Sequence, residues 1–382
     1  MRNLDHPHRP KKCTLLAVTV LAVALLASGC ADTTYLWGSA TGHLKLLQAA
    51  RPVDDWLADD STPPVLKQRL LQAQGIRHFA IDVLKLPDNA SYQRYAQLQR
   101  RAVVWNVVAA PPDSLTLKTW CFPVVGCVGY RGYFEEQDAK QEADAQRVQG
   151  LEASVYGVPA YSTLGWTNWL GGDPLLSTFI QYPQGELARM VFHEMSHQVV
   201  YVQGDTAFNE SFATAVERLG SAAWLASQSN PKVEAEYASF DARRRAFRAL
   251  TARTRLQLKA IYVDADAIGV GSTSDIPSNA AELEARKVAA YAAFRQAYAE
   301  LKKSWGGHGA YDQWVANANN AAFGALAAYD DWVPAFEVLF GRAGGDWQAF
   351  YTSVRHLAEL PREQRTQQLH QLTAEQPVLS GK

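Results

Sequence analysis

The sequence lacks an excess of charge of either sign. Its 382 residues include 37 lysines and arginines against 38 aspartates and glutamates, which gives a net charge of −1. Proteins that bind nucleic acid usually present a strongly basic surface, because phosphate contacts dominate such binding. We therefore expect no nucleic-acid partner, and the balance of charge gives no reason to expect attraction to acidic lipids.

The sequence also lacks internal repeats, low-complexity tracts and any shift in composition that would mark a domain boundary. Hydrophobic residues make up 48 % of the chain, which is enough to fill a sizeable core. We expect residues 30–382 to form a single globular domain. No feature of the sequence indicates an oligomeric state.

Only the N-terminus carries a long apolar run, from Leu15 to Ala27, and this run is too short to span a bilayer comfortably. Four basic residues between Arg2 and Lys12 precede it. A positive head followed by an apolar segment is the layout of an export signal. The sequence therefore predicts a signal peptide over residues 1–29.

The signal ends in Leu26-Ala27-Ser28-Gly29-Cys30, which resembles the bacterial lipobox, where a cysteine is lipidated and becomes the mature N-terminus. We expect Cys30 to anchor the protein to a bacterial membrane. Ala31 favours delivery to the outer membrane, with the protein facing the periplasm. An uncleaved signal anchor and an ordinary cleavage site are the alternatives.

Cysteine is scarce, with four in the chain. Cys13 would leave with the signal and Cys30 would carry the lipid, so that Cys121 and Cys127 remain to be explained. Export places this pair in an oxidising compartment, where a disulfide can persist. A disulfide between them is our leading interpretation, and the alternatives are two buried free thiols or a metal site.

The apolar periodicity predicts a predominantly helical α+β fold with a small antiparallel sheet. Helices are expected over residues 35–84, 135–150, 231–262, 279–305, 311–340 and 346–357. Strands are expected over residues 102–110, 115–120, 128–134, and as a pair at 154–156 and 160–164, broken at Gly157 and Pro159. The C-terminal part, about 231–360, would thus form extra helical layers.

The run His193-Glu194-Met195-Ser196-His197 carries the clearest chemical signal. The apolar spacing around it predicts a helix after Pro183 with the motif in its middle. Two histidines four residues apart project from one face of a helix, where both imidazoles can bind the same metal ion. Glu194 then lies beside the metal, in position to act as a general base.

A catalytic zinc ion usually takes three protein ligands, so a third donor is required. Glu210 is the best candidate, because Gly204 can end the first helix and Asp205 or Thr206 can cap a second one that returns antiparallel. The catalytic helices would occupy about 184–220 and hold one zinc ion per chain.

Further side chains are expected to support this site. Glu217 lies seven residues after Glu210 and can orient a histidine, with Asn209 a weaker candidate for that task. In hydrolysis, Glu194 would take the proton of the attacking water and deliver it to the leaving amine. Tyr161 or Tyr182 could stabilise the oxyanion.

Several of these runs resemble the bacterial putative aminopeptidase family. The resemblance covers nearly all of the mature chain and is carried by Gly185–Arg189, Phe192–Glu194, Phe208–Ala213, Cys121–Cys127 with Tyr130–Phe134, and Ala160–Gly165. It implies a zincin-like metallopeptidase core in which the glutamate ligand is similar to that of the gluzincin branch. It also implies peptide substrates and aminopeptidase activity.

A second interpretation is a catalytically silent lipoprotein that uses this fold to bind a peptide or protein partner. The large helical C-terminal part motivates it. Glu194 argues against it, because a structural zinc site usually has four closed protein ligands and needs no general base. We therefore favour a zinc-dependent peptidase.

Overall fold

The computed structural model describes residues 35–122, 126–160, 163, 171–269, 276–326 and 332–375. The predicted signal peptide and Cys30 lie outside these ranges. Contacts within the chain group residues 47–382 as one compact unit and place the residues up to Leu46 in another. A helix over 35–49 begins in the first unit, and all other described elements belong to the second. None of the helices in the described ranges is both long and apolar enough to cross a membrane.

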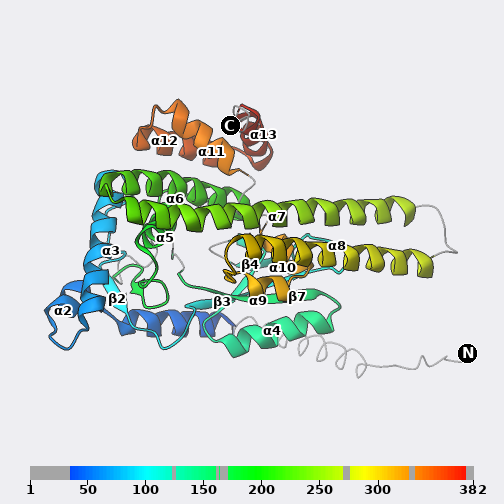
Figure 1. The fold of residues 1–382 in the computed structure, drawn as a ribbon, viewed down its shortest axis with the longest axis horizontal. Helices are drawn as coiled ribbons and strands as arrows, with labels where there is room; N and C mark the ends of the chain where they lie inside the picture. The colour runs from blue at the N-terminus through cyan, green and yellow to red at the C-terminus, as the bar shows by residue number, and fades with distance from the viewer. Residues whose placement is uncertain are drawn as a thin grey trace, which may run out of the picture. The chain divides into compact units, whose positions relative to one another are not determined.

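Helices dominate the larger unit, as expected (Figure 1). They are α2 (Val53–Ala58), α3 (Pro64–Asp82), α4 (Glu136–Val148), α5 (Gln184–Ser196), α6 (Thr206–Gln228), α7 (Pro231–Gly269), α8 (Ile276–Ser304), α9 (Asp312–Ala316), α10 (Asn320–Leu326), α11 (Val333–Arg342), α12 (Trp347–Glu359) and α13 (Arg362–Ala374). Together with a few small sheets they give the predicted α+β class.

Within the described residues, three small sheets accompany the helices. Their strands are β1 (Ala50–Pro52), β2 (Arg94–Ala96), β3 (Val104–Ala110), β4 (Trp120–Phe122), β5 (Gly126–Val128), β6 (Arg131–Tyr133), β7 (Glu152–Val158) and β8 (Leu175–Leu176). The orders are β1-β2-β8, β6-β3-β7 and β4-β5, and all pairs are antiparallel except β2 with β8. The expectation of one antiparallel sheet was therefore incomplete, because β1, β2 and β8 are too short to show a periodic pattern.

Strand β3 is buried along its whole length because helices cover both of its faces. Trp105, Val107 and Ala109 pack in one cluster with residues of α4. Val108 and Ala110 point the other way and pack against α10. Successive strand residues face opposite sides, so a strand covered on both sides reads as the continuous apolar run seen in the sequence.

Two of the expected strand boundaries were wrong. Strand β7 runs unbroken through Gly157. A Cβ atom at this position would lie 2.6 Å from the Cβ of Ala102, so the glycine lets the two backbone segments approach each other. Residues 114–119 form no strand. Leu115 packs against a cluster of buried residues that come mainly from α7 and α8, and Leu117 packs between β3 and α10. The second strand of the predicted pair, 160–164, lies partly outside the described residues, and neither Ala160 nor Thr163 is in a strand.

The C-terminal helices also differ from expectation. The single helix predicted over 311–340 is divided into α9, α10 and α11, and Asn319 accepts a hydrogen bond from Ala322 N (2.9 Å) at the start of α10. Helix α13 was not predicted, because its sequence is polar and buries little apart from Arg365, Leu369 and Leu372. Helices α7 and α8 run antiparallel side by side as a long hairpin (Figure 1).

Helix α5 is held by α3, α6 and α7. Gly220 of α6 allows close contact, since a Cβ atom there would lie 3.1 Å from the Phe192 ring of α5 and 2.7 Å from Leu84. At the start of α5, a Cβ atom on Gly185 would lie 2.6 Å from the Tyr237 ring of α7. Both glycines thus bring helix backbones close together around the histidine motif.

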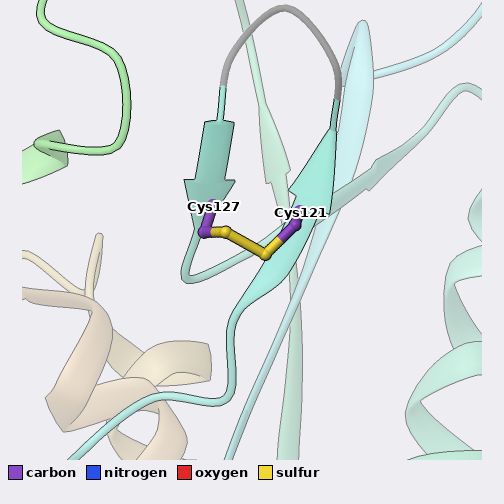
Figure 2. Close-up of a disulfide and its surroundings, with 2 residues drawn as sticks. All are labelled: Cys121 and Cys127. Carbon is purple, nitrogen blue, oxygen red and sulfur yellow. A yellow bond between two sulfur atoms is a disulfide. The ribbon is translucent and has the colours of Figure 1, made fainter.

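The structure contains the Cys121–Cys127 disulfide, which joins β4 to β5 at directly paired positions (Figure 2). Gly126 has a φ of +77°, and a Cβ atom there would lie 2.7 Å from Gln203 Cγ. The bonded hairpin therefore packs against the connection between α5 and α6. The disulfide-bonded strands therefore contact the segment that follows the histidine motif.

Replacing both cysteines by serine, Cys121→Ser with Cys127→Ser, is expected to lower the free energy of unfolding by about 2 kcal/mol. The loss is small because the bond closes a short loop, with a sequence separation of 6. Urea unfolding of the oxidised protein and of the double variant measures the difference. A reducing agent should destabilise the wild type by the same amount and leave the double variant unchanged, and a reductant effect on the double variant would contradict the assignment.

Candidate metal centre

The histidine motif lies at the C-terminal end of α5. Leu187, Val191 and Met195 bury one face of the helix, and Pro183 precedes its first turn. The expectation that the motif lies in mid-helix was wrong: α5 ends at Ser196, and tighter turns follow, with Val199 N donating to Ser196 O (2.9 Å). His197 nevertheless keeps helical angles (φ −60°, ψ −17°), so the two imidazoles stay on one side of the helix.

Helix α6 begins at Thr206, where the Asp205 side chain accepts a hydrogen bond from Phe208 N (3.2 Å). Gly204 (φ +75°) lies within the connection and does not end α5. Asn209 was expected near a histidine, but its side chain bonds the backbone N and O of Val202, both at 2.8 Å. Asn209 therefore closes the turn between the helices.

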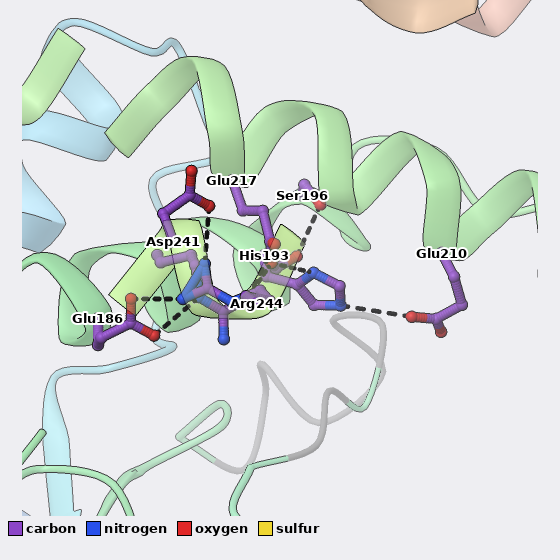
Figure 3. Close-up of polar contacts among 8 residues, drawn as sticks. Glu186, His193, Ser196, Glu210, Glu217, Asp241 and Arg244 are labelled. Carbon is purple, nitrogen blue, oxygen red and sulfur yellow. Dashed lines mark hydrogen bonds and ion pairs between the residues drawn. The ribbon is translucent and has the colours of Figure 1, made fainter. Parts of the chain in front are cut away.

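The two helices bring three donor groups together. Glu210 Oε2 lies 3.4 Å from His193 Nε2, and Glu210 Oε1 lies 3.8 Å from His197 Nε2 (Figure 3 shows the His193 contact). One donor atom from each residue lies within 4.8 Å of the other two. Tetrahedral ligands with bonds of about 2.0–2.1 Å lie about 3.3 Å apart. A slight contraction would let His193, His197 and Glu210 hold one metal ion.

Glu217 lies behind His193, on the same face of α6 as Glu210. Its Oε2 is 2.9 Å from His193 Nδ1, which leaves Nε2 directed at Glu210 (Figure 3). Metal-bound histidines usually donate their second ring N–H to such a carboxylate. The spacing of these two glutamates in the sequence led to this placement.

The carboxylates make the centre attractive to a cation. Burial lowers the pKa of His193, but hydrogen bonds to Glu210 and Glu217 outweigh it and raise the pKa to about 10. Burial raises the pKa of Glu210, yet the two histidines oppose this effect and leave the pKa below its ordinary value. Burial also raises the pKa of Glu217, but Arg189 and His193 outweigh this effect and hold the pKa far below its usual range. Both glutamates are therefore ionised at neutral pH.

Glu194 and His197 have environments of another kind. Burial raises the pKa of Glu194 to about 7, and the charge of Glu210 adds to the rise although His193 opposes it. Burial lowers the pKa of His197 to about 4. Glu194 is thus a base poised near neutral pH, and His197 is a neutral imidazole whose lone pair is available to a metal.

Of the two tyrosines expected at the oxyanion, the structure describes only Tyr182. Tyr161 lies outside the described residues. Burial raises the pKa of Tyr182, and the charges that act on it are those of Arg189 and Glu186.

Other tyrosines near the site were missed in the sequence. Burial raises the pKa of Tyr92, and Glu194 adds to the rise. Burial also raises the pKa values of Tyr156 and Tyr201, with a contribution from Glu210 in both cases. Tyr201 follows the motif closely, but Tyr92 and Tyr156 come from distant segments and no local pattern marks them.

Arg189 was also missed as a site residue. Its Nη1 lies 2.8 Å from each carboxylate oxygen of Glu217, and its Nε lies 3.3 Å from Glu186 Oε2. The arginine stands one turn before His193 on α5. That spacing was the available signal, because it places both side chains on the same face of the helix.

Comparison with known protein families suggests that the chain is a peptidase. The model of the family described as putative aminopeptidase matches residues 34–369. No curated protein and no solved structure matches the chain. The matched range contains His193, Glu194, His197 and Glu210 together with the helices that carry them. The chain therefore belongs to the putative aminopeptidase family.

Proposed function

We propose that the protein is a zinc-dependent peptidase that uses Glu194 as its general base. The observation that carries this proposal is the convergence of His193, His197 and Glu210, with histidine-to-carboxylate distances of 3.4 and 3.8 Å, next to Glu194. The family assignment supports peptide substrates. Cleavage next to a free N-terminus is the specific activity proposed.

The donor set favours zinc. Two imidazoles and one carboxylate are a common ligand set of catalytic zinc, and three protein ligands leave a position open for water. Magnesium and calcium prefer oxygen ligands alone. The nitrogen donors of His193 and His197 therefore argue for zinc, with one ion per chain.

The residues around the centre can carry out hydrolysis in two proton transfers. A zinc ion held by His193, His197 and Glu210 would lower the pKa of its water and polarise the scissile carbonyl. Glu194 accepts the proton of the attacking water and then delivers it to the leaving amine. Glu217 holds His193 in one orientation, through the contact to Nδ1.

We also propose that the mature protein begins at Cys30 and is tethered by lipid to the outer membrane, facing the periplasm. Residues 30–382 would form one zincin-like domain. The basic head, the apolar run and the lipobox-like end support export. The Cys121–Cys127 disulfide is consistent with an oxidising compartment.

The test uses a soluble form that begins after Cys30. After zinc loading and dialysis, elemental analysis should give one zinc ion per chain. The same protein should then cleave peptides from a mixed library, and acetylation of their N-termini should prevent cleavage if the enzyme is an aminopeptidase. Cleavage of acetylated peptides would instead indicate an endopeptidase.

Two outcomes would overturn the proposal. A protein that retains no zinc lacks the proposed centre. A protein that retains zinc but cleaves no peptide would favour the alternative of a lipoprotein that binds a peptide or protein partner without turnover. That alternative draws on the long α7–α8 hairpin and the helices that follow it.

A further inference from the structure

A chain of charged side chains leads away from the metal centre. Glu217 contacts His193 Nδ1 at 2.9 Å and receives two hydrogen bonds of 2.8 Å from Arg189. Arg189 Nε lies 3.3 Å from Glu186 Oε2, one turn earlier on α5. The imidazole of His193 on α5 is therefore the first member of a continuous series of ion pairs that passes through Glu217 of α6 and returns to α5 at Arg189.

This series of ion pairs continues onto α7. Arg244 pairs with Glu186 Oε1, the carboxylate oxygen that Arg189 leaves free, and its Nη1 lies 3.1 Å from Asp241 Oδ1 (Figure 3). Asp241 also pairs with Arg245, whose side chain is 67 % exposed. The series of ion pairs thus ends at the surface of the α7–α8 hairpin.

Burial makes the inner pairs sensitive to the loss of a partner. The side chain of Glu217 is 3 % exposed, that of Glu186 is 11 % exposed, and that of Arg189 is 18 % exposed. Removing one partner from a buried pair leaves the other charge poorly compensated. Each member is therefore constrained by both of its neighbours.

Geometry makes the arginine at position 189 specific. A guanidinium presents donors in a fixed plane and can engage two acceptors at once, which an ammonium cannot do in the same way. Arg189 bonds both oxygens of Glu217 and also reaches Glu186. It therefore fixes the orientation of the carboxylate that in turn fixes His193.

Helix α7 packs closely enough against α5 for its position to affect the side chains of α5. Gly185 precedes Glu186 on α5, and a Cβ atom there would lie 2.6 Å from the Tyr237 ring of α7. Tyr237 lies seven residues before Arg244, on the same side of α7. The approach of the two helices and the pairing of Arg244 with Glu186 are thus parts of one contact.

We propose that α7 is part of the metal centre: Arg244 holds Glu186, Glu186 holds Arg189, and Arg189 positions Glu217 and thereby His193. Arg189, Glu186 and Arg244 are positioning residues, since none of them contacts the metal-binding nitrogen. The inference rests on the proposed zinc site. It predicts that the affinity for zinc depends on a residue of the α7–α8 hairpin.

The test compares Arg244→Gln with Arg253→Gln in the soluble mature protein. Zinc affinity is measured by competition with a chromogenic chelator, and the absorption spectrum of the Co²⁺-loaded protein reports the geometry of the ligands. Arg244→Gln should weaken zinc binding by about 2- to 30-fold and alter the Co²⁺ spectrum. Arg253→Gln removes the same charge from an exposed position of α7 outside the series of ion pairs and should match the wild type.

The direction of the change separates positioning from simple charge. Loss of a positive charge near the site would by itself strengthen the binding of a cation. Weaker binding by Arg244→Gln therefore reports the loss of alignment. Arg189→Lys keeps the charge but loses the fork of donors, and it should weaken zinc binding by about 10- to 100-fold, as at other outer-sphere partners.

The outcomes distinguish this inference from the proposed function. If the wild type binds neither Zn²⁺ nor Co²⁺, the proposed function fails and the inference fails with it. If the wild type binds zinc but Arg244→Gln and Arg189→Lys bind it equally well, only the positioning chain is disproved. Thermal unfolding of the zinc-free variants identifies a folding defect, and should Arg244→Gln not fold, Arg244→Lys, which keeps the charge but loses the planar guanidinium, takes its place.

Discussion

Glu194→Gln is expected to lower kcat for peptide hydrolysis by about 10²- to 10⁴-fold, because the amide cannot take a proton from water. Glutamine has nearly the same shape, and Glu194 is not one of the three residues that could hold the metal. Zinc content and KM should therefore change little. A variant that binds zinc normally but does not turn over would identify Glu194 as the base.

Initial rates on one cleaved peptide, with zinc content measured on the same sample, give the result. Glu236→Gln is a matched control, because this glutamate is exposed on α7 and outside the site. It should retain wild-type kcat. Unchanged hydrolysis by Glu194→Gln would rule out the proposed mechanism, whatever the metal content.

His193→Ala is expected to lower the affinity for zinc by more than about 100-fold. Loss of an outer partner of a ligand already costs about 10- to 100-fold at such sites, and His193 is a proposed ligand itself. The substitution also removes the group that lies between Glu210 and Glu217, 3.4 and 2.9 Å away. Peptide hydrolysis should fall with the loss of zinc.

Competition with a chelator gives the affinity, and elemental analysis gives the zinc retained after dialysis. His356→Ala is the matched control, since His356 lies exposed on α12. It should bind zinc as the wild type does. Retention of one tightly bound zinc ion by His193→Ala would show that the metal lies elsewhere in the protein.

The convergence of His193, His197 and Glu210 could be predicted from the sequence because it depends on local geometry. Helical periodicity places His193 and His197 on one face, and a short connection with a capping Asp205 returns Glu210 to them. The seven-residue spacing from Glu210 places Glu217 on the same face of α6. These relationships follow from the pitch of a helix and the properties of helix ends.

The other parts of the site could not be predicted because they depend on distant segments. The approach of Arg244 to Glu186 requires the docking of α7 on α5. Tyr92 is brought near Glu194 by a loop between α3 and β2, and its φ of +64° is unusual for a large side chain. Neither feature is specified by a repeating pattern within one element.

The same difference explains the errors in the fold. The long helices and β3 show regular apolar spacing over many residues, whereas β1, β2 and β8 contain two or three residues each. The break before α10 depends on one side chain, that of Asn319, which caps the helix. Such features depend on single contacts and leave no periodic signal.

The proposed ligands all lie between residues 193 and 210, at the C-terminal end of α5 and on α6, which a short connection joins. Contacts between segments close in sequence require little loop closure and tend to form early in folding. The contact of Arg244 with Glu186 closes a much longer stretch of chain. Under the proposed zinc site, His193, His197 and Glu210 would therefore come together before α7 has docked, and under the proposed series of ion pairs the later docking of α7 would tighten the hold on the ion.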